Sequence, residues 1–209
     1  MLASYRFDSN YHPAPSSGLS DHAFRLLEAG TFAPGQYCPV LTREFGQLRM
    51  HYCQWGNEGI HHIYHRKAIT PVASLLTDRD LPTIFPSSRC LIPGNAYYFQ
   101  TPDGRNWKVE AEEEDAFCFA GLRYRREGKD GEMTNHFSIL ATAAQGALSD
   151  YHLLMPVMIP KHLEMAWLNP ATSQTRINAW LTEPCSASLS ICEVQYLQEK
   201  DPSWSHLAA

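Results

Sequence analysis

Short segments with the composition of β-strands succeed one another from residue 36 to residue 143. Each is rich in β-branched and aromatic residues, and Gly, Pro, Asn and Asp separate one from the next. They read QYCPVLT, QLRMHYCQWG, RCLIPG, AYYFQ, NWKVEAE, AFCFAGLRYR and HFSILATA. Between two of them, Thr101-Pro102-Asp103-Gly104 predicts a tight turn. We therefore expect a mostly antiparallel, barrel-like β-sheet.

Helical signals lie on both sides of this strand-rich stretch. Ser20 and Asp21 precede HAFRLLEAG, which predicts a helix that Ser20 caps and Gly30 ends. After Pro160, the segments KHLEMAWL and SQTRINAWL predict two more helices, and SLSICEVQYLQ predicts a final strand. The sequence thus indicates an α+β fold with a few short flanking helices, in a single domain over residues 1–209.

The charge balance of the chain limits the partners that it can take. Only 19% of the residues are charged and the formal net charge is −5, which excludes a strongly basic nucleic-acid binder and a charged disordered tail. Any contact with DNA must therefore come from a local basic patch. No stretch approaches the roughly 20 apolar residues of a membrane span, and the start lacks the apolar core of a signal peptide. We expect a cytoplasmic protein with no membrane contact.

The metal-ligating residue types are not arranged as in common metal sites. Six cysteines lie scattered without paired spacing, and in a reducing cytosol we expect them to be small buried apolar residues. His61, His62 and His65 would share one face of a helix and could bind a transition metal, but no carboxylate or fourth ligand lies nearby. We therefore predict no metal and no cofactor. The acidic run at residues 112–115 is expected to be a solvated turn.

Six segments follow one another in the order found in a known family. They are FAPGQYCPV at residues 32–40, Trp55-Gly56, SRCLIPGNAYYFQ at 88–100, FAGL at 119–122, FSILATAA at 137–144 and YHLLMPVMI at 151–159. Together they resemble the SRAP family, the SOS response-associated peptidases, which process abasic sites. The resemblance implies an SRAP-like fold, binding to single-stranded DNA and covalent linkage to abasic sites during the DNA damage response. It also implies a peptidase-like release of the leader peptide.

The family's nucleophile is a cysteine directly after the initiator methionine. Its α-amine and thiol close a thiazolidine ring with the aldehyde of a ring-opened abasic site. The resemblance places this position at Leu2, which carries no nucleophile. The bulk of Leu2 disfavours methionine removal, so the α-amine would remain on Met1. That amine can form a reversible imine with an aldehyde, but not the stable ring.

The resemblance places the family's other catalytic positions at further residues of this chain. The family's glutamate, a general acid or base, falls on Phe99, which neither donates nor accepts a proton. Its histidine is retained as His152, whereas the neighbouring phosphate-binding arginine has become Leu154. Its asparagine and arginine correspond to His65 and Lys67. We therefore expect a degenerate member of the family, with His152 as the retained catalytic group.

Candidate DNA contacts come from the family's loops and from the one dense basic cluster in the chain. They are Pro34, Trp55, Lys67, Arg89, Arg123, Arg125 and Arg126. The arginines and the lysine would neutralise phosphates, and the tryptophan would stack on a base.

Three functional hypotheses remain open. In the first, the chain is a catalytically impaired SRAP homologue, a pseudoenzyme that binds single-stranded or abasic DNA weakly. In the second, it remains active through an imine at the Met1 amine, with His152 moving a proton. In the third, the drier cleft left by Leu2, Phe99 and Leu154 binds a peptide or a partner protein.

Overall fold

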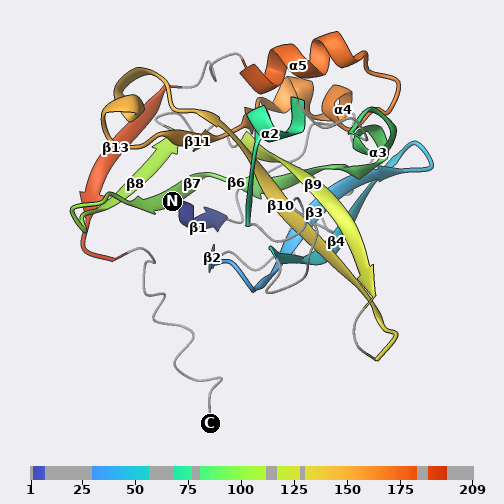
Figure 1. The fold of residues 1–209 in the computed structure, drawn as a ribbon, viewed down its shortest axis with the longest axis horizontal. Helices are drawn as coiled ribbons and strands as arrows, with labels where there is room; N and C mark the ends of the chain where they lie inside the picture. The colour runs from blue at the N-terminus through green and yellow to red at the C-terminus, as the bar shows by residue number, and fades with distance from the viewer. Residues whose placement is uncertain are drawn as a thin grey trace.

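The strands of the protein form two sheets, which Figure 1 shows with most of the helices gathered on one side. The computed structural model describes residues 2–7, 30–56, 68–76, 81–111, 117–127, 130–182 and 188–196. The predicted combination of a mostly antiparallel, barrel-like sheet with a few short helices is confirmed.

Five strands of the larger sheet close into a barrel. They are β3 (Tyr37–Glu44), β4 (Gln47–Trp55), β6 (Arg89–Gly94), β9 (Phe117–Glu127) and β10 (Met133–Ala143). Around the ring the order is β4, β3, β6, β9 and β10, and β10 pairs with both β9 and β4, which completes the closure. Closure satisfies the edges that an open sheet would expose. The short strands β5 (Ile69–Pro71), β11 (Leu154–Pro156) and β12 (Met158–Ile159) extend this sheet.

The smaller sheet contains five strands in antiparallel order. From edge to edge they are β13 (Leu189–Val194), β8 (Asn106–Ala111), β7 (Ala96–Gln100), β1 (Leu2–Phe7) and β2 (Gly30–Phe32). The predicted turn at residues 101–104 joins β7 to β8, and Gly104 adopts a φ of +88° there, which a side chain would disfavour. The predicted final strand is confirmed as β13.

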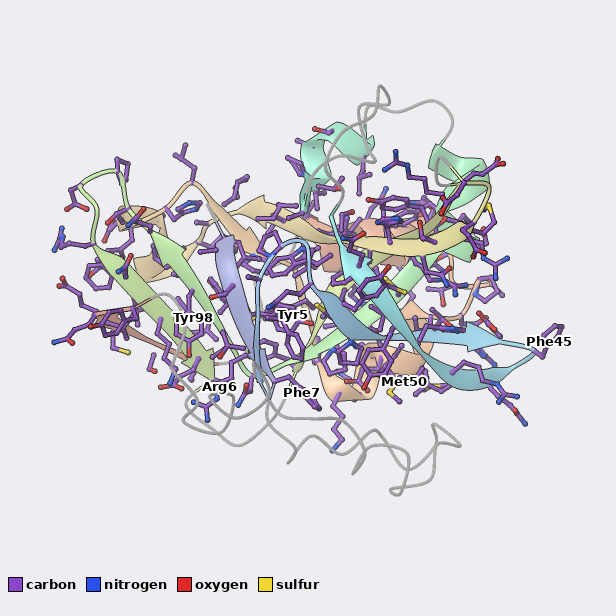
Figure 2. The ribbon with its side chains drawn as sticks, turned by 90° about the horizontal axis from the view of Figure 1, so that it is seen from below. Tyr5, Arg6, Phe7, Phe45, Met50 and Tyr98 are labelled. Atoms are coloured by element: carbon purple, nitrogen blue, oxygen red, sulfur yellow. The ribbon has the colours of Figure 1, made fainter. Side chains whose placement is uncertain are left out.

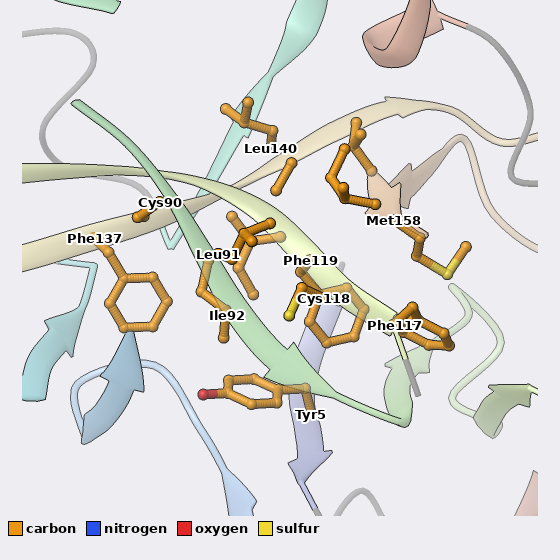
Figure 3. Packing of buried hydrophobic residues seen from close by; sticks show 14 of the residues in the cluster. Tyr5, Cys90, Leu91, Ile92, Phe117, Cys118, Phe119, Phe137, Leu140 and Met158 are labelled. Carbon is orange, nitrogen blue, oxygen red and sulfur yellow. The ribbon is translucent and has the colours of Figure 1, made fainter. Parts of the chain in front are cut away.

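One buried cluster connects the two sheets. The ring of Tyr5, on β1, packs edge-on against Trp55 of β4 and Phe119 of β9, with centroid distances of 5.2 and 5.7 Å. Figure 3 shows Tyr5 directed toward Ile92 and Phe119 of the barrel. A Cβ at Gly121 would lie 2.3 Å from Cδ1 of Ile92, so the barrel wall requires a glycine at this close approach. The first strand therefore packs onto the barrel through large aromatic side chains.

The helices are short. They are α2 (Val72–Leu76), α3 (Leu81–Ser88), the 3₁₀ helices η2 (Gly146–Asp150) and η3 (Lys161–Leu163), α4 (Glu164–Trp167) and α5 (Gln174–Thr182). The two helices predicted after Pro160 are confirmed as η3 with α4 and as α5. In the described ranges, no helix has the length and apolar character to cross a membrane.

Some elements were not predicted from the sequence. The strands β1 and β2 and the helices α2 and α3 carry too few residues, or too mixed a composition, to give a period. The helix predicted from Ser20 lies outside the described residues, except that Gly30, expected to end it, begins β2 instead.

Candidate functional site

The pairing of β1 with β7 places Leu2 directly opposite Phe99. Both side chains are buried, with exposed fractions of 6% and 2%. Residues directly opposite each other in an antiparallel pair have Cβ atoms about 5 Å apart, so the two side chains share one face of the sheet. The two positions that the family resemblance identified as nucleophile and glutamate are therefore neighbours, and both are apolar.

His152 lies against the same pair of residues. It follows η2 in the connection to β11, and its ring meets the Phe99 ring edge-on, with a centroid distance of 5.2 Å. The Nδ1 atom of His152 lies 2.8 Å from the carbonyl oxygen of Leu154, so in the neutral ring Nδ1–H donates to that oxygen. The structure thus brings together Leu2, Phe99 and His152, which we call the apolar trio site.

The His152 ring favours its neutral form. Burial lowers the pKa of His152 below its usual range, the hydrogen bond to the Leu154 carbonyl opposes this shift, and the positive chain terminus adds to it. A neutral imidazole can accept or pass on a proton near neutral pH. In this site the imidazole meets the Phe99 ring edge-on and bonds to the Leu154 carbonyl oxygen.

Large side chains form the rim of the apolar trio site. The rings of Trp107 and Tyr151 pack at a centroid distance of 4.4 Å, and Tyr151 directly precedes His152. Leu153 is 87% exposed and Leu154 is also exposed. An exposed apolar pair beside a buried apolar pair makes this surface poorly suited to a charged ligand.

Four of the five described thiols are buried. Cys38, Cys53, Cys90 and Cys118 are buried in the barrel, and Cys192 is exposed on β13. Burial raises the pKa of Cys38 to about 12 and that of Cys53 to about 11, and it also raises the pKa of Cys90 well above its usual range. Because the thiolate is the reactive form, these buried thiols are inert near neutral pH.

Two of the predicted DNA contacts lie inside the protein. Trp55 has no exposed surface, donates its indole N–H to the carbonyl oxygen of Ala68 at 2.7 Å, and stacks on Phe137. It cannot stack on a base without leaving the core, so that prediction is corrected. Pro34, by contrast, is exposed at the turn between β2 and β3.

Arg89 is also corrected. It is 4% exposed, and its Nε and Nη2 atoms donate to the carbonyl oxygens of Trp167 and Asn169, each at 2.7 Å. Its guanidinium lies over the rings of Phe85 and Trp167. These contacts join α4 to the start of β6, and they leave no free face of Arg89 for a phosphate.

The remaining basic cluster lies along β9. Arg125 is exposed, Arg126 is partly buried, and Arg123 donates from Nη2 to Oε1 of Glu44 at 3.0 Å. Oε1 of Glu44 also lies 3.0 Å from Nε2 of His51. Burial alone would raise the pKa of Glu44, but the charges of His51 and Arg123 outweigh it and lower the pKa. Glu44, His51 and Arg123 form the charged triad, which the sequence did not reveal because its members come from different strands.

Several predicted positions fall outside the described residues. They are Met1, His65 and Lys67, together with His61, His62 and the acidic run at residues 112–115. Of the predicted catalytic positions, the structure describes Leu2, Phe99 and His152.

Comparisons with known proteins place the chain among proteins of one family. A sequence model of the family described as SOS response associated peptidase (SRAP) matches residues 20–198. Two curated relatives, both called abasic site processing protein YoqW, come from Bacillus subtilis strain 168 and from Bacillus phage SPbeta. Each is 27% identical over 105 residues, which is 48% of this chain and 47% of the relative. The chain thus spans about half the length of the curated relatives it matches.

Solved structures share the fold over most of the chain. A protein from Bordetella bronchiseptica has a TM-score of 0.71 at 15% identity, covering 93% of this chain and 100% of that chain. A phage-related protein from the same organism has a TM-score of 0.67 at 20% identity, covering 93% and 94%. A protein from Bacteroides thetaiotaomicron has a TM-score of 0.66 at 19% identity, covering 86% and 84%. At these identities the likeness shows the fold alone.

Proposed function

Because this chain belongs to the SOS response associated peptidase (SRAP) family, we propose that it binds single-stranded and abasic DNA without forming the stable covalent link of that family. The name of the YoqW relatives, abasic site processing protein, supports the choice of ligand. Free thiols among the described cysteines suit a cytoplasmic protein. In this proposal the protein protects or occupies a lesion and does not process it.

The observation that carries the proposal is the pairing of Leu2 with Phe99 and the ring contact of Phe99 with His152. Covalent capture of an aldehyde requires a nucleophile, and catalysis of that step requires a group that moves a proton. At the apolar trio site, leucine and phenylalanine side chains pack where the family resemblance places a thiol and a carboxylate. The His152 imidazole, with its lowered pKa, can shuttle a proton, but neither the leucine nor the phenylalanine side chain is a nucleophile that it could activate.

Binding to the DNA backbone would come from the exposed part of the basic cluster on β9. The Arg125 side chain is exposed and makes no hydrogen bond or ion pair within the part of the chain that the structure describes. Arg123 keeps a partner in Glu44, which reduces the charge that it can offer to a phosphate. With a net charge of −5, this local patch would give weak binding with a strong salt dependence.

The proposal is tested by equilibrium binding. Fluorescence anisotropy with a labelled single-stranded oligonucleotide, with and without an abasic site, should give saturable binding that weakens as salt rises. Arg125→Gln should weaken binding to all sequences and lower the salt slope by about 0.7. Lys161→Gln, an exposed lysine outside the cluster, is the matched control. Absence of saturable binding at low salt would reject the proposal.

A borohydride experiment separates this proposal from imine chemistry. The protein is incubated with abasic single-stranded DNA, with and without the reductant, and the products are resolved on a denaturing gel. An adduct seen only after reduction would show that an amine condenses with the aldehyde, and it would favour the imine hypothesis with His152 as proton carrier. We expect no adduct above the level given by His152→Gln.

A specific observation favours a second candidate function. Leu153 projects from the rim of the apolar trio site with 87% of its surface exposed, and Leu154 lies next to it. Exposed apolar pairs beside a buried apolar surface suit a peptide or a partner protein. Loss of partner capture in Leu153→Ser, with DNA binding unchanged, would support this candidate.

A further inference from the structure

The tip of the β3–β4 hairpin carries a fully exposed aromatic side chain. Phe45 has 101% of its reference surface exposed, and Figure 2 shows it projecting beyond the ribbon at one end of the molecule. Tyr98, on β7, lies toward the other end in the same view. A single exposed apolar residue is common on protein surfaces, so what distinguishes Phe45 is its backbone conformation and its charged neighbours.

The backbone at this tip is one that phenylalanine does not favour. Glu44 pairs with Gln47, so Phe45 and Gly46 make a two-residue turn. Their φ values are +52° and +79°, which is the combination of a type I′ turn. Asparagine and glycine prefer these positions, because a bulky side chain crowds the following carbonyl oxygen in the left-handed region. Phe45 is the only described residue other than glycine with a positive φ. The ring is therefore held at the tip against local preference.

Arginines lie on both faces of the hairpin behind this ring. Arg43 pairs with Leu48 and Arg49 with Thr42, and adjacent residues of a strand point to opposite faces. Nε of Arg43 donates to the Gly46 carbonyl oxygen at 3.4 Å, and Nη2 of Arg49 donates to Oε1 of Gln47 at 3.1 Å. Both acceptors are neutral, so within the described ranges no carboxylate neutralises either arginine. The tip thus presents one aromatic ring between two cations.

We propose that the β3–β4 tip is a second contact for single-stranded nucleic acid, in which Phe45 stacks on a base while Arg43 and Arg49 neutralise the flanking phosphates. An aromatic ring beside unpaired arginines is the combination that single-strand binding uses, since every base offers a face for stacking and every nucleotide a phosphate. An apolar protein partner would match the ring but not the two charges. The inference rests on the proposed binding of single-stranded DNA and adds a contact remote from the apolar trio site.

The tip lies far from the apolar trio site but near the basic cluster on β9. The eight residue steps from Tyr37, at the start of β3, to Phe45 span about 26 Å of strand, and the barrel end that contacts β1 lies near that start. Arg123 of β9, in contrast, contacts Glu44, which directly precedes Phe45. A strand of nucleic acid held at Arg125 therefore has a shorter path to Phe45 than one held at the apolar trio site.

Phe45→Asn tests the proposal, because asparagine suits the turn but cannot stack as a phenyl ring does. Affinity for a single-stranded oligonucleotide of about 20 nucleotides should fall roughly 5- to 100-fold. The melting temperature should stay the same or rise. Phe45→Trp should keep the affinity of the unchanged chain, and Tyr52→Ala, at another exposed aromatic of the hairpin, should have no effect.

A charge variant gives a second, independent readout. Arg43→Gln with Arg49→Gln should lower the slope of log affinity against log salt by roughly 1.4. Equal affinity of Phe45→Asn and the unchanged chain for the oligonucleotide would overturn the stacking contact, even where both proteins bind it. If the unchanged chain does not bind the oligonucleotide at low salt, the proposed DNA binding is wrong, and the stacking contact is wrong with it.

Discussion

The apolar trio site and the charged triad hold opposite kinds of side chain within one fold. Leu2, Phe99 and His152 meet in the smaller sheet, where the two apolar side chains are buried and the histidine favours its neutral form. Glu44, His51 and Arg123 meet on β3, β4 and β9, where one carboxylate lies 3.0 Å from each of its two partners. The comparison teaches that this fold can hold ionised groups. The apolar character of the trio therefore comes from the residues at that site and is not imposed by the fold.

Placing a carboxylate in the apolar trio site should have the largest effect on stability. Phe99→Glu replaces a buried ring with a group that prefers water, and we expect it to lower the free energy of unfolding by about 3–5 kcal/mol at pH 7. Burial raises the pKa of such a carboxyl group above its unfolded value, so the loss should shrink as pH falls toward 5. Urea unfolding at both pH values measures it.

Phe99→Leu is the matched control for that variant. It also removes part of the ring contact but adds no charge, and we expect a loss of about 1–2 kcal/mol that does not change with pH. Equal stability of the two variants at pH 7 would mean that the trio is wetter than its burial indicates.

Breaking the charged triad should have a smaller effect. Arg123→Met leaves Glu44 with only the His51 ring beside it, and we expect the free energy of unfolding to fall by about 1–2 kcal/mol, because the pair is partly exposed and screened. The pKa of Glu44 should rise toward its usual value, which carboxyl NMR shifts would follow. Arg125→Met, two residues along the same strand, should change stability by less than about 0.5 kcal/mol. A loss as large for Arg125→Met as for Arg123→Met would remove the distinction between them.

The smallest expected effect is a loss of stability in mild acid. Burial lowers the pKa of His136 and of His152, so each favours its neutral form in the folded state. Their contribution is present above the unfolded pKa of about 6.5 and is lost as pH falls through the lower folded values. We expect the melting temperature to fall by about 2–4 °C between pH 7 and pH 5.

His136 offers the sharper test of this acid effect. Its Nδ1–H donates to the Gly56 carbonyl oxygen at 3.1 Å, and its Nε2 lies 2.8 Å from the Thr134 hydroxyl, so a second proton would place a charge on a buried ring. His136→Gln should therefore reduce the dependence on pH more than His162→Gln, at an exposed histidine on η3. If the melting temperature of His136→Gln depends on pH as strongly as that of the unchanged chain, the acid effect belongs to other groups.

The sequence predicted the strands better than the site. Alternating β-branched and aromatic residues mark β3, β4 and β6 through β10, and the caps and prolines mark α4 and α5. Closure of the barrel could not be read from these patterns, because the pairing of β10 with β4 joins strands far apart in the chain. The strand β1 was missed because its six residues give no clear period.

The trio was anticipated only through the family resemblance. No sequence pattern distinguishes Leu2 and Phe99 from other apolar residues. Only the register of β1 against β7 makes them neighbours. Arg89 and Trp55 were misassigned as DNA contacts, since the sequence does not show which arginine or tryptophan is buried. The exposure and positive φ of Phe45 likewise depend on a turn whose two residues were not recognised as a hairpin tip.

The most direct test of the account is the yield of heat-stable adduct on abasic single-stranded DNA without reductant. The unchanged chain is run on a denaturing gel beside Leu2→Cys, with removal of the methionine in the variant confirmed by intact mass. We predict no adduct from either protein, because Phe99 supplies no proton-moving group even where a thiol is present. A heat-stable adduct from the unchanged chain would contradict the claim that the apolar trio site has lost its covalent chemistry. A strong adduct from Leu2→Cys alone would show that the missing carboxylate is not required.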